Sequence, residues 1–408
     1  MSVATSTHFT CASASGENWR DICKIVLEQL ESVRTDGFRP NIGFLYMTDD
    51  LAADASSILT LVRSVTGVRH WSGCAALGIC GVGVEYIDKS AISIMIGQIE
   101  SEDFREFHVA TPRFKNLQQS LEPWLNKHDP MLVYLHADPA QESHPMQTIE
   151  EVEALTGGFM VGGFASSRTQ TALVSGDIMN AGASGFVFSQ AATVATALSQ
   201  GCIPMGPLRE ISAMGEHVVS YLEGRSAFEV FSDDMKAMSE KRLGYSADDV
   251  LLHGEGAVPQ NLLQLLNGET HVAFPVAGTD VGDFMVRNIM AIDPEQGIIA
   301  VGETIENGQK MMFVYRDDET VRTDLAATLV ALRARVLHEH GRFSPKAALY
   351  VSCVARTATD FEKNGQSGGE MKMIREILGD IPIAGFYANG EISGGRLYSY
   401  TGILTLFL

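Results

Sequence analysis

A chain of 408 residues is long enough to form two hydrophobic cores, so we expect two domains. Apolar residues make up 45% of the chain and charged residues 20%, a composition that excludes disordered and collagen-like chains. The formal net charge of −20 argues against nucleic acid and anionic membrane surfaces as partners, because both carry negative charge.

The sequence predicts neither membrane insertion nor secretion. It contains no run of about 18 apolar residues, and its first segment lacks the basic and apolar regions of a signal peptide. The six cysteines are scattered without a C-x-x-C pair, which is typical of reduced thiols, and the 11 histidines form no metal-binding motif. We therefore expect a cytoplasmic protein without a structural metal site.

One order of elements occurs three times along the chain after an N-terminal extension, residues 1–29, that includes a helix start. Each copy has an apolar strand, a helix, a second strand running into a glycine-centred turn, and a returning strand. The copies begin at Ile42, Met131 and Ala348 and end at Gln98, Ser189 and Leu408. Such a β-α-β-β unit gives a mixed sheet with a helix on one face. We predict an α/β (α+β) fold in which two mixed sheets pack face to face, with helices outside.

A different region separates the second and third copies. Pro204 and Pro207 mark a turn that precedes alternating apolar residues. Residues 227–240 and 320–339 have helical patterns, and the turn signals DPEQG and ENGQ divide residues 284–317 into the strands of a three-stranded meander. We place the boundary between the N-terminal and C-terminal halves near residues 190–202.

Several segments have the pattern of a known family. The run IPIAGFYANGEI followed by TGILTLFL resembles the close of a FIST C-terminal domain, and IPMGP, VRNIMAIDPEQGIIAVGETIENGQ and VSCVAR resemble earlier parts of it in the right order. WSGCAALG and VGGFASS resemble the glycine-centred turns of the FIST N-terminal domain. By this resemblance, residues 30–192 correspond to the FIST N-terminal domain and residues 200–408 to the C-terminal one.

The resemblance implies an intracellular sensory module for signal transduction. Such a module binds a small molecule, with amino acids a commonly proposed class, and passes the signal to an output domain or protein. We recognise no kinase, cyclase, F-box or DNA-binding segment in the sequence. The output is therefore expected to travel through a separate partner protein.

The turn from Gly385 to Glu391 is the strongest candidate for a ligand site. Phe386 and Tyr387 could supply an apolar wall, Asn389 an amide and Glu391 a carboxylate, all at a strand end. The same residues also fit an ordinary Asn-Gly hairpin turn with a solvated glutamate.

Two further groups could join this site. Cys353 and Arg356 follow a predicted strand, where α/β sheets present ligand-contacting groups, and Arg356 could hold a ligand carboxylate. Gly163, Phe164 and Ser166 occupy the corresponding turn of the second copy, and both turns could line one cleft between the two halves. The alternatives are a buried structural thiol, a structural ion pair and plain turn geometry.

Other functions stay open beside the ligand sensor. Some FIST proteins are described as haem-binding nitric oxide sensors, and His136 and His253 are candidate axial ligands, although no motif singles either out. Cys353 could serve acyl or thiol chemistry, but no histidine or aspartate motif marks a catalytic partner, so we expect no cofactor and no enzymatic activity. A scaffold that recruits partners without a ligand is the remaining alternative.

Overall fold

The computed structural model describes residues 7–33, 37–110, 114–139, 145–248, 250, 259–266, 268–276, 283–357 and 369–408. The chain divides into two compact units. Unit 1 comprises Met1–Ser199 and Leu325–Leu408, and unit 2 comprises Gln200–Asp324. The predicted N-terminal and C-terminal domains, residues 30–192 and 200–408, differ in extent from these two units and stay a prediction. Because the chain returns to unit 1 at Leu325, the third copy of the predicted repeat belongs to the same unit as the first two.

Unit 1 contains three six-stranded mixed sheets, numbered I to III here. Sheet I has the order β1 (His8–Ser15), β6 (Ala91–Gln98), β2 (Ile42–Thr48), β3 (His70–Ala76), β10 (Leu173–Ser175) and β11 (Asp177–Met179). Sheet II has the order β7 (Phe104–Val109), β12 (Ala183–Ser189), β8 (Pro130–Ala137), β9 (Phe159–Phe164), β24 (Glu391–Ser393) and β25 (Arg396–Tyr398). Sheet III has the order β13 (Val194–Ser199), β26 (Gly402–Phe407), β22 (Ala347–Cys353), β23 (Ile383–Ala388), β4 (Gly78–Gly81) and β5 (Val84–Ile87).

The three sheets share one pairing scheme. In each, the two central strands are parallel and the returning strand is antiparallel to the first of them. β1, which the sequence did not predict, pairs with β6 and makes the N-terminal segment part of sheet I. The origin of these three segments in one repeated β-α-β-β unit stays a prediction.

A hairpin from one segment completes the sheet of another. The β4–β5 hairpin follows β3 of sheet I along the chain but pairs with β23 of sheet III. The β10–β11 hairpin follows β9 of sheet II but pairs with β3 of sheet I, and β24–β25 follows β23 but pairs with β9. The three sheets therefore exchange hairpins in a cycle, and each sheet depends on another segment of the chain.

Three glycines allow the central parallel strands to approach. Gly73, Gly162 and Gly385 lie opposite Leu45, Leu135 and Tyr350, and a Cβ on each would stand only 1.8–1.9 Å from the facing carbonyl oxygen. Gly73 and Gly162 also have φ angles of 154° and 150°, which disfavour other residues. The glycine that corresponds to Gly385 is thus Gly162, one position before the Gly163 that we expected.

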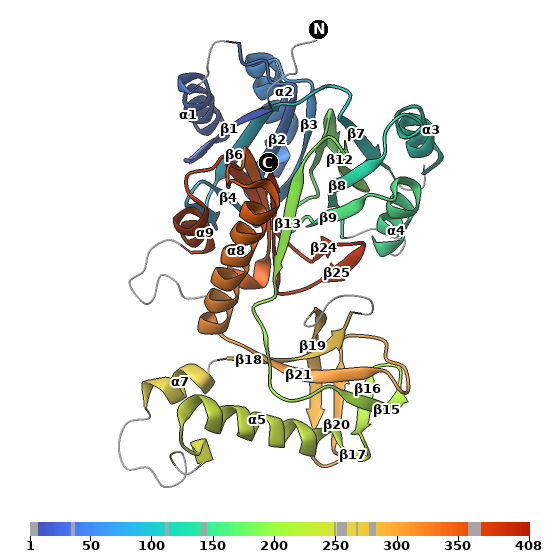
Figure 1. The fold of residues 1–408 in the computed structure, drawn as a ribbon. Coiled ribbons are helices and arrows are strands. Elements are labelled where there is room, and N and C mark those ends of the chain that lie inside the picture. Colours follow the sequence, from blue (N-terminus) through green and yellow to red (C-terminus); the bar gives the residue numbers. More distant parts are fainter. Residues whose placement is uncertain are drawn as a thin grey trace. The chain divides into compact units, whose positions relative to one another are not determined.

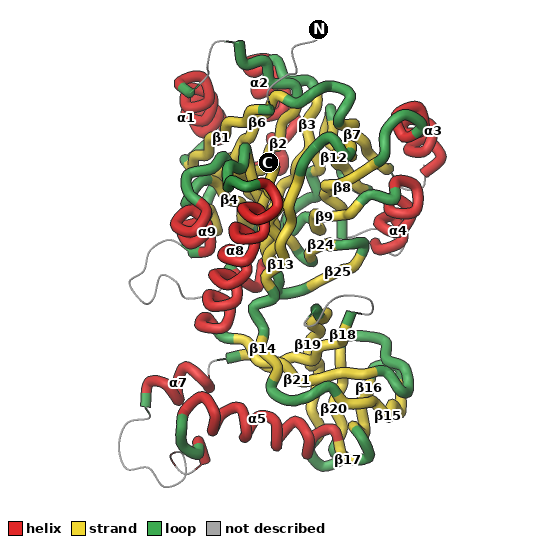
Figure 2. The backbone as a smooth tube through the Cα atoms, viewed as in Figure 1, coloured by secondary structure: helices red, strands yellow, loops and turns green. Residues whose placement is uncertain are grey.

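Helices cover the outer faces of the three sheets (Figures 1 and 2). α1 (Trp19–Ser32) and α2 (Ala55–Thr66), which follows the 3-10 helix η1 (Asp49–Asp54), pack on sheet I; α3 (Phe114–Leu125) and α4 (Pro145–Thr156) on sheet II; α9 (Glu370–Leu378) and the part of α8 (Asp318–His340) in unit 1 on sheet III. α1 buries Ile22, Cys23, Val26 and Leu30, the spacing of one helix face. In the described part of the chain, no helix has both the length and the apolar composition of a membrane span.

The inner faces of all three sheets share one core. Phe44 and Tyr46 of sheet I, Tyr134 of sheet II and Phe386 of sheet III belong to it. The predicted mixed sheets with outer helices are confirmed. The core is enclosed by three sheets, however, and not by the two of an αββα stack, because every segment has its own apolar inner face.

Unit 2 is built around a closed ring of strands. The order of strands in the ring is β21 (Lys310–Arg316), β15 (Arg209–Gly215), β16 (Val218–Leu222), β20 (Ile298–Val301), β19 (Phe284–Asp293) and β18 (Glu269–Pro275). The ring closes because β18 also pairs with β21. Unit 2 also contains β14 (Ile203–Pro204), β17 (Arg225–Ser226), α5 (Ala227–Leu243) and α7 (Gln260–Leu266). The predicted three-stranded meander is wrong in its second pairing, that of the second strand with the third. β19 pairs with β20, but β21 pairs with β18 and β15.

Candidate functional site

The two predicted turns meet inside unit 1. β24 pairs with β9 so that Glu391 lies opposite Gly163. The Asn389 amide donates to the carbonyl of Phe164 over 2.9 Å, and the Ser166 hydroxyl donates to the carbonyl of Tyr387. The turn of the second copy and the turn of the third are therefore one continuous structure at the junction of sheets II and III.

Most of the predicted site residues in this structure are buried. Phe386 stacks on Tyr46 in the shared core, with ring centroids 5.5 Å apart, and Tyr387 is also buried. Of the predicted ligand contacts in this turn, only Asn389 is exposed to solvent.

Glu391 has an unusual environment for a carboxyl group. It is completely buried, and its Oε2 accepts hydrogen bonds from the Thr401 amide at 3.1 Å and the Thr401 hydroxyl at 2.9 Å. Its Oε1 has no hydrogen-bond partner among the described residues. Burial raises the pKa of Glu391 to about 8, against the smaller lowering effects of Thr401 and Cys353. This side chain is not the solvated glutamate of an ordinary hairpin.

Arg356 is held by the protein itself. Its guanidinium is fully buried and forms an ion pair with Glu370 at 2.6 Å, while Tyr350 and Ser352 donate hydrogen bonds to the same carboxylate. It also donates to the Ser199 carbonyl and hydroxyl. In this structure Arg356 therefore joins β13, β22 and α9 as a structural ion pair, the alternative to a ligand clamp.

Sequence reasoning missed a second buried carboxyl beside this ion pair. Glu85 of β5 accepts a hydrogen bond from the Met371 amide, 2.9 Å away, in the first turn of α9. Burial, together with the charge of the nearby Glu370, raises the pKa of Glu85 to about 7. No sequence signal marks Glu85, because its neighbours Glu370 and Met371 lie almost 300 positions away.

Cys353 lies in surroundings that suppress thiolate formation. Its side chain is buried, and desolvation together with the charge of Glu391 raises the pKa of the thiol far above its usual range. These surroundings favour the structural alternative for Cys353.

His136 is enclosed in the shared core. Its Nδ1 lies 3.0 Å from the Ser72 hydroxyl and its Nε2 lies 3.1 Å from the Tyr46 hydroxyl. Burial lowers its pKa to about 3, so the ring is neutral at physiological pH. With both nitrogens engaged, His136 does not fit the role of an axial haem ligand, and His253 lies outside the described residues. Within the described ranges, no three His, Cys, Asp or Glu side chains form a metal-binding group.

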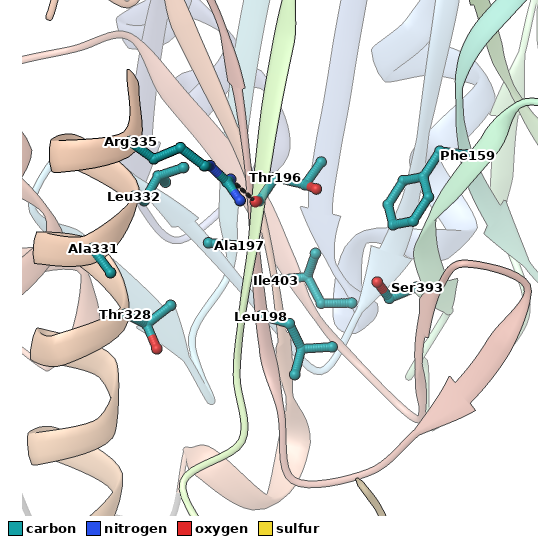
Figure 3. A pocket seen from close by; sticks show the side chains of 10 residues that line it. All are labelled: Phe159, Thr196, Ala197, Leu198, Thr328, Ala331, Leu332, Arg335, Ser393 and Ile403. Carbon is teal, nitrogen blue, oxygen red and sulfur yellow. Dashed lines mark hydrogen bonds between the residues drawn. The ribbon is translucent and has the colours of Figure 1, made fainter. Parts of the chain in front are cut away.

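A pocket of about 440 Å³ lies between strands of sheets II and III and the helix α8 (Figure 3). We refer to it as the groove. It is lined by Phe159, Thr196, Ala197, Leu198, Thr328, Ala331, Leu332, Arg335, Ser393 and Ile403. The β13 strand runs through it, with α8 on one side and Phe159 and Ser393 on the other. The sequence did not predict the groove, because its lining residues come from five separate segments and contain no motif.

Glu391 and the groove residue Ser393 lie on the same face of β24. Ser393 lies two positions after Glu391 on β24, and Ile403 lies two positions after Thr401 at the start of β26. Alternate residues of a strand point to the same face, whereas Ile392 packs in the outer layer with α3 and α4. A group bound against Ser393 and Ile403 would therefore press on the strands that hold Glu391.

Comparison with known proteins identifies two adjacent family domains. The model of the FIST N domain matches residues 41–225, and that of the FIST C domain matches residues 247–394. Together they cover most of the chain. Of the residues that line the groove, those of β9 and β13 fall in the FIST N match and those of α8 and β24 in the FIST C match, so both matched regions contribute to it within unit 1.

Similar proteins occur in mycobacteria. The chain is 28% identical over 263 residues to the uncharacterized protein Rv0628c of Mycobacterium tuberculosis, and the alignment spans 62% of each protein. It is 27% identical over 386 residues to the uncharacterized protein Mb0898c of Mycobacterium bovis, across 91% of this chain and 92% of that protein. Their printed names assign no activity.

Proposed function

Because the chain belongs to the FIST family, whose domains are generally assigned a sensory role in signal transduction, we propose that it is a sensory module whose groove binds a small molecule. The observation that carries this proposal is the groove itself, placed on the strand faces that lead to Glu391. Its volume of about 440 Å³ is in the range of small-molecule sites, and its lining combines apolar walls with a few polar groups.

Glu391 provides a means of passing on the binding event. A buried carboxyl that is held mainly through one oxygen can change its protonation or its hydrogen bonds when the surrounding strands shift. The predicted contact residues Gly163, Phe164 and Tyr387 would then act in transmission rather than in direct binding. The signal would pass to a separate partner protein, in the cytoplasm as the sequence predicts.

The groove is suited to binding and not to redox or acid–base chemistry. Its lining has no histidine, cysteine, tyrosine or methionine that could hold haem iron, and no carboxyl or imidazole that could transfer a proton. We therefore propose a function that needs no cofactor and no catalysis. An absorbance spectrum after incubation with haem tests the first point, because a stable Soret band would contradict it.

Thermal-shift screening of a small-metabolite library, amino acids included, tests the binding function. Thr328→Phe fills the groove from α8, and Thr323→Phe is its matched control, because Thr323 lies on the same helix outside the lining. We expect at least one compound to raise the melting temperature of the wild type and of Thr323→Phe but not of Thr328→Phe. If no compound stabilises the protein, or if all three proteins respond equally, the proposal is wrong.

A further inference from the structure

We infer that the groove selects a small carboxylate with an apolar body, an inference that rests on the proposed function. Arg335 is the only charged residue among those that line the groove. The chain as a whole has a net charge of −20, whereas the lining of the groove contains no Asp or Glu and therefore differs from the acidic composition of the chain. An anion would enter a site whose single full charge is positive.

One hydrogen bond orients the Arg335 guanidinium and leaves other N–H donors available to a ligand. Its Nη2 donates one hydrogen bond, to the carbonyl of Thr196 on β13. None of the ion pairs among the described residues involves Arg335. A guanidinium has five N–H donors in a planar fork that matches a carboxylate, so the remaining donors of Arg335 can receive one.

The other side of the groove is apolar. Figure 3 shows Arg335 on α8 and Phe159 on β9 at opposite sides, with Leu198 and Ile403 between them. Phe159 is 46% exposed, which is high for a large apolar residue. A ligand with its carboxylate at Arg335 would cover these apolar side chains with its body.

This arrangement discriminates between head groups. The ammonium of an amino acid or an amine would find no carboxylate in the lining, although the hydroxyls of Thr196, Thr328 and Ser393 could hydrogen-bond to it. A neutral alcohol could contact the apolar wall but would not use the charge of Arg335. We therefore expect a preference for a monocarboxylate over the amino acid that the family resemblance suggests.

Four probes with one phenylpropyl skeleton test this preference by isothermal titration of the whole chain. They are 3-phenylpropanoate, phenylalanine, 3-phenylpropan-1-ol and 3-phenylpropylamine. We expect 3-phenylpropanoate to bind at least about 10-fold more tightly than the other three. The alcohol and the amine have no carboxylate for a charge-assisted bidentate pair with Arg335, and phenylalanine has one only together with an ammonium that no carboxylate of the lining would pair. Equal or weaker binding of 3-phenylpropanoate, or no measurable binding of it, would overturn the inference.

Substitutions in the groove test whether the preference for 3-phenylpropanoate arises there. Arg335→Gln should weaken 3-phenylpropanoate binding about 10-fold or more and leave the affinity for the alcohol unchanged, whereas Phe159→Ala should weaken both. Arg342→Gln removes the same charge from an exposed site outside the lining and should change neither affinity. An unchanged 3-phenylpropanoate affinity in Arg335→Gln would also overturn the inference.

The outcomes separate this inference from the proposed function. If other compounds bind and Thr328→Phe abolishes their binding, while 3-phenylpropanoate has no advantage, the groove is a ligand site of a different class. If no compound responds to Thr328→Phe, the proposed function itself fails.

Discussion

At the scale of single residues, Glu391 links stability to pH. Its pKa is raised from 4.5 to about 8 in the folded protein, so the folded state holds a proton that the unfolded state releases. The stability contributed by this proton is complete below about pH 4.5 and is lost as pH rises to about 8. The ionised carboxyl therefore opposes folding under mildly alkaline conditions.

Glu391→Gln should remove this pH dependence, because an amide keeps the size of the side chain and does not ionise. Relative to wild type, we expect its free energy of unfolding to increase by on the order of 2–4 kcal/mol between pH 5 and pH 9. Urea denaturation at the two pH values measures the difference. A gap between variant and wild type that does not change with pH would show that Glu391 has an ordinary pKa.

At the scale of the elements, glycines fix the spacing of the central parallel strands. Gly73→Ala would bring a Cβ to 1.8 Å from the Leu45 carbonyl oxygen, and we expect a loss of more than about 3 kcal/mol of stability. Gly302→Ala is the control, since the nearest atom to its Cβ would be the Met290 sulfur at 3.6 Å. Soluble yield and urea denaturation report the effect, and equal stability of the two variants would contradict this account of β2 and β3.

Elements specified by local patterns were predicted well. The strands β2, β8 and β22 begin within one residue of the predicted starts of the three copies, and the helices α5 and α8 cover the predicted ranges 227–240 and 320–339, because strand and helix formers recur there at regular spacing. Pairings between distant segments were not predicted. β21 joins β18 and β15 because the ring of unit 2 closes, and two of the three exchanged hairpins pair across more than 200 positions.

The candidate site shows the same limit. The turns at Gly163 and Gly385 are neighbours in the structure, whereas the prediction that they line one ligand cleft between the two halves stays a prediction. The sequence did not predict that Glu391 is buried or that Arg356 is held by Glu370. The burial of a turn depends on which sheet packs against it. Here sheet III and the exchanged hairpins bury the turn, and both result from pairings between distant segments.

At the scale of the whole molecule, the hairpin exchange makes the two sequence halves interdependent. A cut after Ala192 separates β4–β5 from sheet III and β24–β25 from sheet II. We expect residues 1–192 alone to lack a cooperative unfolding transition, and co-expression with residues 193–408 to restore it. Circular dichroism during urea denaturation and co-purification of the two fragments measure this. Cooperative unfolding of 1–192 by itself would mean that sheet II is stable without its exchanged hairpin.

The central claim is that a small molecule binds in the groove and acts on the strands that lead to Glu391. Hydrogen exchange measured by mass spectrometry, with and without saturating 3-phenylpropanoate, tests it most directly. We expect slower exchange in three segments that line the groove: residues 194–199 of β13, 391–393 of β24 and 328–335 of α8. Unchanged exchange in all three segments, or slowing confined to unit 2, would contradict this claim.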